Sequence, residues 1–185
     1  MMPLAFAVVA PALPPDSRRL QSCFHEAGHA VVAQALGVNV DEVRVSADGS
    51  GCAHAIHRAE ARFEMQIAFA GPAAEKCYCK LVGGVDAERD PLHYEHEDRE
   101  IAWAVAQQES DGDKGQATRL MLEMQAASEA RVDSLWERIF EAAVILDVSG
   151  HLSGVELDAL GDNARAFTPS PEKVSPNPRR NDPAP

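Results

Sequence analysis

Cysteine and long apolar runs are both scarce in this sequence. Its 185 residues include only four cysteines, whose spacing is typical neither of a disulfide framework nor of a zinc ribbon. We therefore expect reduced thiols and a cytoplasmic protein. No apolar run approaches the roughly 18 to 20 residues that a membrane span needs. The short run from Leu4 to Ala10 has no Lys or Arg before it, so we do not expect it to be an export signal.

Positive charge is also in short supply. Lys and Arg total 17 against 29 Asp and Glu, which gives a formal net charge of −12. Such a field repels phosphate backbones and anionic lipids, so binding to nucleic acid or to a membrane surface is not expected. A cationic or neutral partner fits this charge better than an acidic one. Oligomeric state cannot be deduced from these numbers.

The composition divides the chain into one domain with two different ends. A hydrophobic content of 45% in 185 residues is typical of a single globular domain with its own core. Residues 168–185 hold six of the twelve prolines and almost no hydrophobic residues, which indicates a disordered tail. We expect a flexible segment over 1–15, a domain over 16–165 and a proline-rich disordered tail over 166–185.

The periodicity of the domain predicts a mainly α fold with one small β element. Asp16 can cap a helix over 17–36 that ends at Gly37, and residues 40–45 and 52–56 read as a hairpin with a turn at Asp48-Gly49. Its second strand is a candidate edge strand.

The remaining elements are helical, with one acidic loop among them. We expect a helix over 59–82 that is interrupted at Gly71-Pro72, followed by a polar loop over 83–97 and a helix over 98–109. A straight or bent helical stretch then continues to Val148. The last element is a short helix with a Ser153/Glu156 capping box that ends near Asn163.

The first predicted helix carries the sequence His25-Glu26-Ala27-Gly28-His29. Positions i and i+4 lie on one face of a helix, so both imidazoles can bind the same metal ion. Zinc takes neutral nitrogen ligands and lowers the pKa of a bound water toward 7. Glu26, about 100° around the helix, can accept the proton of that water as general base. Gly28 suggests that either another backbone or the metal comes close at this position.

Two histidines do not complete a catalytic zinc site. The extended motif HExxHxxGxxH needs glycine at Val32 and histidine at Ala35, which excludes the metzincins. The downstream candidates for a third ligand are Glu75, His93, Glu95, His96, Glu97 and Asp98. Spacing alone does not choose among them.

Three segments resemble the peptidase domain of the FtsH-type, ATP-dependent zinc metalloproteases. They are CFHEAGHAVVAQALGV, IAFAGPAAEKCYC and HEDREIAWAVA, in the order and at separations similar to those of that family. The resemblance extends over about residues 17–163. It implies a helical, zincin-like peptidase fold, with Asp98 as the third zinc ligand beside His25 and His29, and Glu26 as the base.

The resemblance implies a zinc metalloendopeptidase. No ATPase module or membrane segment of the FtsH-type family accompanies the motifs here, so we expect an ATP-independent enzyme that acts on peptides or unfolded chains, unless a separate ATPase delivers substrates. The alternative is a non-catalytic binding or regulatory module that keeps only the metal or the fold. Zinc chemistry on a bond other than a peptide bond also stays open.

Overall fold

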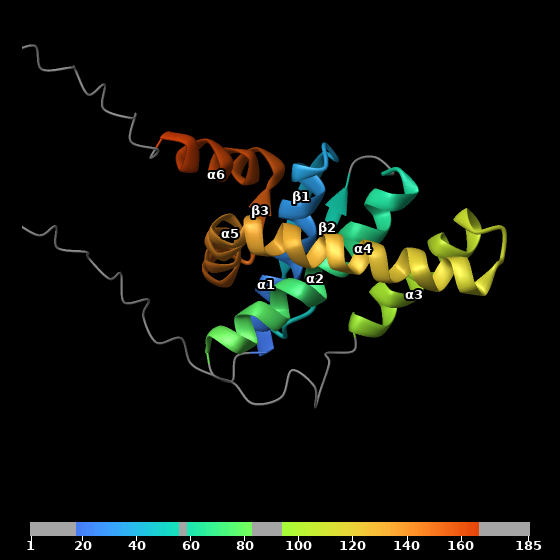
Figure 1. Cartoon of the computed structure of the whole chain (residues 1–185). Coiled ribbons are helices and arrows are strands. Elements are labelled where there is room, and N and C mark those ends of the chain that lie inside the picture. Colours follow the sequence, from blue (N-terminus) through green and yellow to red (C-terminus); the bar gives the residue numbers. More distant parts are fainter. Residues whose placement is uncertain (1–17, 56–58, 83–93, 167–185) are drawn as a thin grey trace, which may run out of the picture.

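The computed structural model describes residues 18–55, 59–82 and 94–166, and over these ranges the chain is mainly helical, as the sequence predicts. The predicted terminal segments and most of the acidic loop lie outside these ranges. Figure 1 shows α3 (Tyr94–Glu109) and its connection to α4 (Lys114–Ser134) at one end of the molecule, with α5 (Trp136–Ser149) and α6 (Gly154–Ala166) at the other. No helix among the described residues is both long and apolar enough to cross a membrane.

Helix α1 (Arg18–Ala35) is the centre of the fold, since it packs against α2 (Ala61–Leu81), α5 and the sheet. Its buried face includes Leu20, Ala27 and Val31, which follow helical spacing. Phe24 stacks on Tyr78 of α2 at a centroid distance of 4.4 Å and contacts Trp136 of α5 as well. Gly37, at φ 79°, ends this segment in the left-handed conformation that glycine adopts without strain. The expected cap, Asp16, lies outside the described residues.

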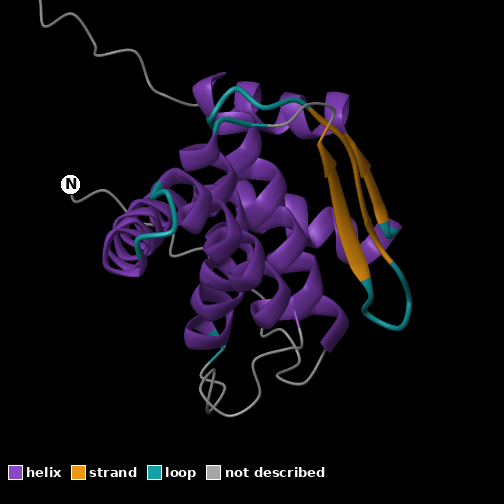
Figure 2. Cartoon of the chain, turned by 90° about the vertical axis from the view of Figure 1, so that its right-hand side faces the viewer, coloured by secondary structure: helices purple, strands orange, loops and turns teal. Residues whose placement is uncertain are grey.

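Within the described residues the sheet has three antiparallel strands, one more than the sequence predicts. Strand β1 (Val40–Val45) lies between β2 (Gly51–Ala55) and β3 (His151–Ser153), so β2 is an edge strand as expected. Figure 2 shows the sheet along one side of the helical bundle. The sequence does not predict the third strand, because three residues are too few to show an alternation of apolar and polar side chains. Its pairing with β1 and the burial of Leu152 hold this strand in place.

The predicted interruption at Gly71-Pro72 is wrong, because α2 runs unbroken from Ala61 to Leu81 with Pro72 inside it. Proline in a helix interior costs about 3 kcal/mol. Packing offsets this cost, since alanines on both sides of the proline, Ala70 and Ala74, are fully buried. A Cβ on Gly28 of α1 would lie 2.6 Å from the carbonyl oxygen of Ala70, so glycine there lets the two helices approach closely, as expected.

A second core joins α2 to α3 and α4. Met65 and Phe69 of α2 pack with Ala102 of α3 and with Met121 and Met124 of α4. Helix α3 begins at Tyr94 rather than at residue 98, so the end of the acidic loop is helical. The long stretch after residue 113 is divided at Leu135 into α4 and α5.

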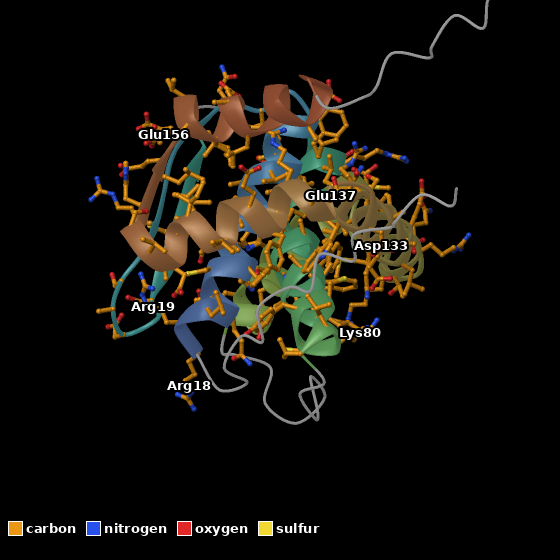
Figure 3. The ribbon with its side chains drawn as sticks, turned by 90° about the vertical axis from the view of Figure 1, so that its left-hand side faces the viewer. Arg18, Arg19, Lys80, Asp133, Glu137 and Glu156 are labelled. Carbon is orange, nitrogen blue, oxygen red and sulfur yellow. The ribbon has the colours of Figure 1, made fainter. Side chains whose placement is uncertain are left out.

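The expected capping box at the start of α6 is present. Glu156 Oε2 accepts hydrogen bonds from the backbone N–H of Ser153 at 2.9 Å and from its hydroxyl at 2.6 Å, while Ser153 Oγ accepts from the N–H of Glu156. Figure 3 labels Glu156 in the first turn of this helix. The box fixes where the chain leaves β3 and turns into the last helix.

Candidate metal centre

Helix α1 presents His25, Glu26 and His29 within one turn, toward the interior of the fold. His25 and Glu26 are buried, and His29 is half-buried. The Nε2 atoms of the two histidines lie 3.0 Å apart. The i, i+4 spacing therefore places two potential ligand atoms at one point, as expected for an amphipathic helix that carries this pattern.

Helix α3 brings Asp98 to the same point. Its Oδ2 atom lies 3.1 Å from Nε2 of His25 and 3.3 Å from Nε2 of His29. Ligand atoms about 2.0 to 2.1 Å from a tetrahedral zinc ion lie roughly 3.3 Å from one another. The triangle of these three atoms is therefore close to the size that zinc requires, and the three residues form a possible metal site.

An oxygen atom of α2 lies on the far side of each imidazole ring, opposite the point where the two Nε2 atoms meet. Nδ1 of His29 lies 2.7 Å from the backbone carbonyl oxygen of Ile67, and Nδ1 of His25 lies 3.4 Å from Oε2 of Glu75. A carbonyl or carboxylate oxygen favours a proton on Nδ1, which leaves Nε2 as a lone-pair donor. Both contacts come from α2, so this helix orients the histidines of α1.

Three electron-pair donors thus converge on one point. Oδ2 of Asp98 is buried and forms no well-aligned hydrogen bond within the described part of the chain. Such an arrangement is unfavourable unless a cation lies between the donors. Two imidazole nitrogens and a carboxylate oxygen are a set that zinc accepts, so the residues fit the metal.

Gly71 of α2 keeps this point clear. A Cβ at residue 71 would lie 2.8 Å from Nε2 of His25 and closer still to Nε2 of His29. Only glycine can therefore occupy this position without displacing the imidazoles. Ile67, Gly71 and Glu75 follow at intervals of four, so one face of α2 borders the candidate site. Gly71 was not predicted as a site residue because Gly71-Pro72 is typical of a helix break, although the spacing of Gly71 to Glu75 was a usable signal.

The charges of the cluster are strongly coupled. Burial lowers the pKa of His25, but the carboxylates of Asp98 and Glu75 raise it by more, so that in the metal-free protein it is about 9. Burial raises the pKa of Asp98, but contacts with His25 and His29 hold it well below its usual range. A proton on His25 therefore supplies the positive charge between the donors when no metal is bound, and a metal ion must displace it.

Glu26 lies against the first residue of the edge strand. A Cβ on Gly51 would lie 2.7 Å from Cγ and 2.8 Å from Oε1 of Glu26, so glycine admits the side chain between α1 and β2. No local sequence pattern predicts this contact, because it depends on how the hairpin folds back over α1. Glu26 is 5% exposed and lines the same cavity as His25 and His29.

A cavity of about 730 Å³ opens beside the three donor residues and Glu26. It is bounded by α1, by β2 and the end of β1, and by the N-terminal parts of α2 and α3. Its apolar lining residues are Ala30, Ala33, Val38, Val40, Ala53, Ala59, Ile67, Ala68 and Ile101. A cavity of this size beside a metal-binding cluster can accept several residues of a chain.

Of the other sequence candidates, Glu75 and Glu97 have described side chains, and neither belongs to the cluster of three converging atoms. Glu75 contacts Nδ1 of His25, on the side of the ring away from the converging atoms. Glu97 has an exposed side chain that lines the cavity. His93 lies outside the described residues, as do the side chains of Glu95 and His96. All four cysteines are free, as expected, and none is part of the donor cluster.

A family model described as Peptidase M50B-like matches residues 2–80. The matched region includes His25, Glu26, His29, Gly71 and Glu75, and ends before Asp98. The match indicates similarity to a metallopeptidase family that is distinct from the FtsH-type family suggested by the motifs. No curated protein matches the chain significantly. The comparisons thus indicate a metallopeptidase in general and imply a metal, usually zinc, in a chain whose fold is mainly helical.

Proposed function

We propose that the protein is a zinc metalloendopeptidase that hydrolyses peptide bonds in peptides or unfolded chains. The observation that carries the proposal is the convergence of His25 Nε2, His29 Nε2 and Asp98 Oδ2 at 3.0 to 3.3 Å, beside a cavity that also contains Glu26. The Peptidase M50B-like match supports the class of enzyme. The more specific FtsH-type likeness remains a proposal based on the three motifs.

The proposed hydrolysis needs three metal ligands and one general base from this chain. His25, His29 and Asp98 would hold the zinc ion, which would act as a Lewis acid toward the scissile carbonyl and would make a nearby water more acidic. Glu26 takes the proton from the attacking water and transfers it to the leaving amine. Its burial between α1 and Gly51 restricts the rotamers of the carboxylate and keeps it at the cavity.

Strand β2 offers a binding surface for the substrate backbone. It is an edge of the described sheet, and its residues Gly51, Cys52 and Ala53 line the cavity. An extended chain that pairs with an edge strand gains affinity from backbone hydrogen bonds, with little dependence on sequence. Proline scanning over residues 52–56 tests this mode, since unchanged peptide cleavage in every variant excludes it.

Partners and location follow from the same proposal. The site needs an extended, accessible chain, so peptides and unfolded proteins are the proposed substrates, with a separate ATPase as the proposed source of unfolded ones. The four free cysteines support the proposed cytoplasmic location. The proposal includes no nucleic acid, in keeping with the net charge of −12.

Glu26→Gln tests the proposal directly. Zinc-loaded wild-type protein, Glu26→Gln and Glu141→Gln are compared on a mixed pool of unfolded peptides, with zinc per chain measured in each. Glu141 lies on the exposed side of α5, away from the cavity, and provides a control with the same change of charge. We expect Glu26→Gln to keep its zinc and lose cleavage by a factor of at least about 100. Zinc retention without cleavage by the wild type supports the non-catalytic module instead.

A further inference from the structure

The cavity beside the candidate metal centre combines an apolar wall with acidic side chains that lie outside the metal cluster. Its aliphatic lining includes Ala33, Val38 and Val40, from α1, β1 and the segment between them, and Ile67 and Ile101, from α2 and α3. Aliphatic side chains of this kind accept an apolar group by excluding water from it. One part of the cavity is therefore suited to an aliphatic side chain of a bound peptide.

Two glutamates outside the metal cluster also line this cavity. Glu64 is half-buried in the first turn of α2, and Glu97 is exposed in the first turn of α3. Among the described residues, no Lys or Arg lines the cavity. Glu26 and Asp98 add further acidic groups, of which Asp98 is matched by the histidines. A cleft lined by one sign of charge concentrates ligands of the opposite sign.

We infer that this cavity selects peptides in which a basic side chain lies close to an aliphatic one, with Glu64 and Glu97 as the residues that determine specificity. The aliphatic group fills the alanine- and valine-lined part, and the ammonium or guanidinium group pairs with the two carboxylates. This inference rests on the proposed peptidase function, since it names the substrate class of that same site.

Two properties of the site favour this class over acidic or purely apolar peptides. An acidic side chain near Glu64 and Glu97 is repelled, and the net charge of −12 opposes its approach from a distance. A purely apolar peptide leaves both carboxylates without a partner on the ligand. Because Glu97 is exposed and Glu64 half-buried, the attraction is screened by salt, so selectivity weakens as ionic strength rises.

The test uses three peptides that differ at one position. That position lies beside a leucine and carries lysine, glutamine or glutamate. Cleavage is measured with the zinc-loaded full chain, and binding is measured by fluorescence anisotropy with Glu26→Gln, which does not require catalysis. Glu64→Gln, Glu97→Gln and their double variant are compared with Glu141→Gln, the control on α5. Each binding variant is also made in the Glu26→Gln background.

We expect the lysine peptide to exceed the glutamate peptide in both binding and kcat/KM. Each charge removed from the cavity lowers this ratio by about threefold to fivefold at low salt, and the double variant by about tenfold or more, whereas Glu141→Gln leaves it unchanged. A selectivity for lysine that disappears in the double variant supports the inference.

The outcomes separate this inference from the proposed function. If the wild type cleaves nothing while Glu26→Gln still binds the lysine peptide through Glu64 and Glu97, the peptidase proposal fails and the inferred ligand class stands. If the wild type cleaves all three peptides equally, or the double variant keeps the wild-type ratio, the inference is overturned and the peptidase proposal stands. Failure of Glu26→Gln to bind any of the peptides also overturns the inference.

Discussion

Replacing Gly71 with alanine is expected to abolish zinc binding while leaving the fold intact. The added Cβ would lie 2.8 Å from Nε2 of His25 and closer still to Nε2 of His29. Normal contact between such atoms needs about 3.5 Å, so the imidazoles must move by about 0.7 Å or more. A zinc site tolerates deviations of only about 0.2 Å in ligand distance. We therefore expect the dissociation constant for zinc to rise by at least about a hundredfold.

The metal-free protein should respond differently, because two opposing effects act on its stability. Alanine stabilises a helix interior by about 1 kcal/mol relative to glycine, and overpacking costs about 1 to 3 kcal/mol. The imidazoles can turn aside when no ion holds them, so the free energy of unfolding should stay within about 1 to 2 kcal/mol of the wild type. Urea unfolding in the presence of a chelator measures this quantity, and competition with a fluorescent chelator measures zinc affinity.

Gly115→Ala is the matched control. Gly115 lies in α4, and a Cβ there meets only the carboxylate end of Asp113, at 3.3 Å. This variant makes the same change from glycine to alanine in a helix, here in its first turn, and should bind zinc as the wild type does. Wild-type zinc affinity in Gly71→Ala refutes the reasoning, since it means that the metal does not lie between the two histidines where the structure brings them together.

The further predictions concern the metal ligands, pH and the core. Asp98→Ala should lose zinc, and Glu75→Gln should weaken zinc binding by about tenfold without abolishing it; equal zinc per chain in wild type and Asp98→Ala by elemental analysis contradicts this. Zinc affinity should rise about tenfold per pH unit from pH 6.5 to pH 9, because zinc binding displaces the proton of His25, whose pKa is about 9. A dissociation constant that does not change with pH rules this out. For the same reason, the stability that His25 gives the metal-free fold is complete below pH 6.5 and is lost as the pH rises through 9, which thermal unfolding in chelator will measure. Tyr78→Phe should stabilise the fold by about 1 to 2 kcal/mol, because the buried hydroxyl of Tyr78 has no hydrogen-bond partner among the described residues; a lower urea midpoint contradicts this.

Local patterns were sufficient for most of the helices. The apolar spacing around Phe24 gave α1, and the Ser153/Glu156 pair gave the start of α6, because each depends on residues within a turn or two. The same reasoning failed at Pro72, where the local cost of proline is offset by the burial of alanines against a distant helix. It also missed β3, whose pairing with β1 joins residues far apart in the chain.

The sequence by itself determined the mainly helical class and the histidine pair, because helical periodicity fixes which residues share a face. It left the third donor open among six residues, and only the resemblance favoured Asp98. Tertiary structure decided the rest: α3 carries Asp98 to within 3.3 Å of both histidines, and α2 supplies Glu75 and the gap at Gly71. Those contacts depend on how three helices pack, a long-range property that local sequence patterns do not encode.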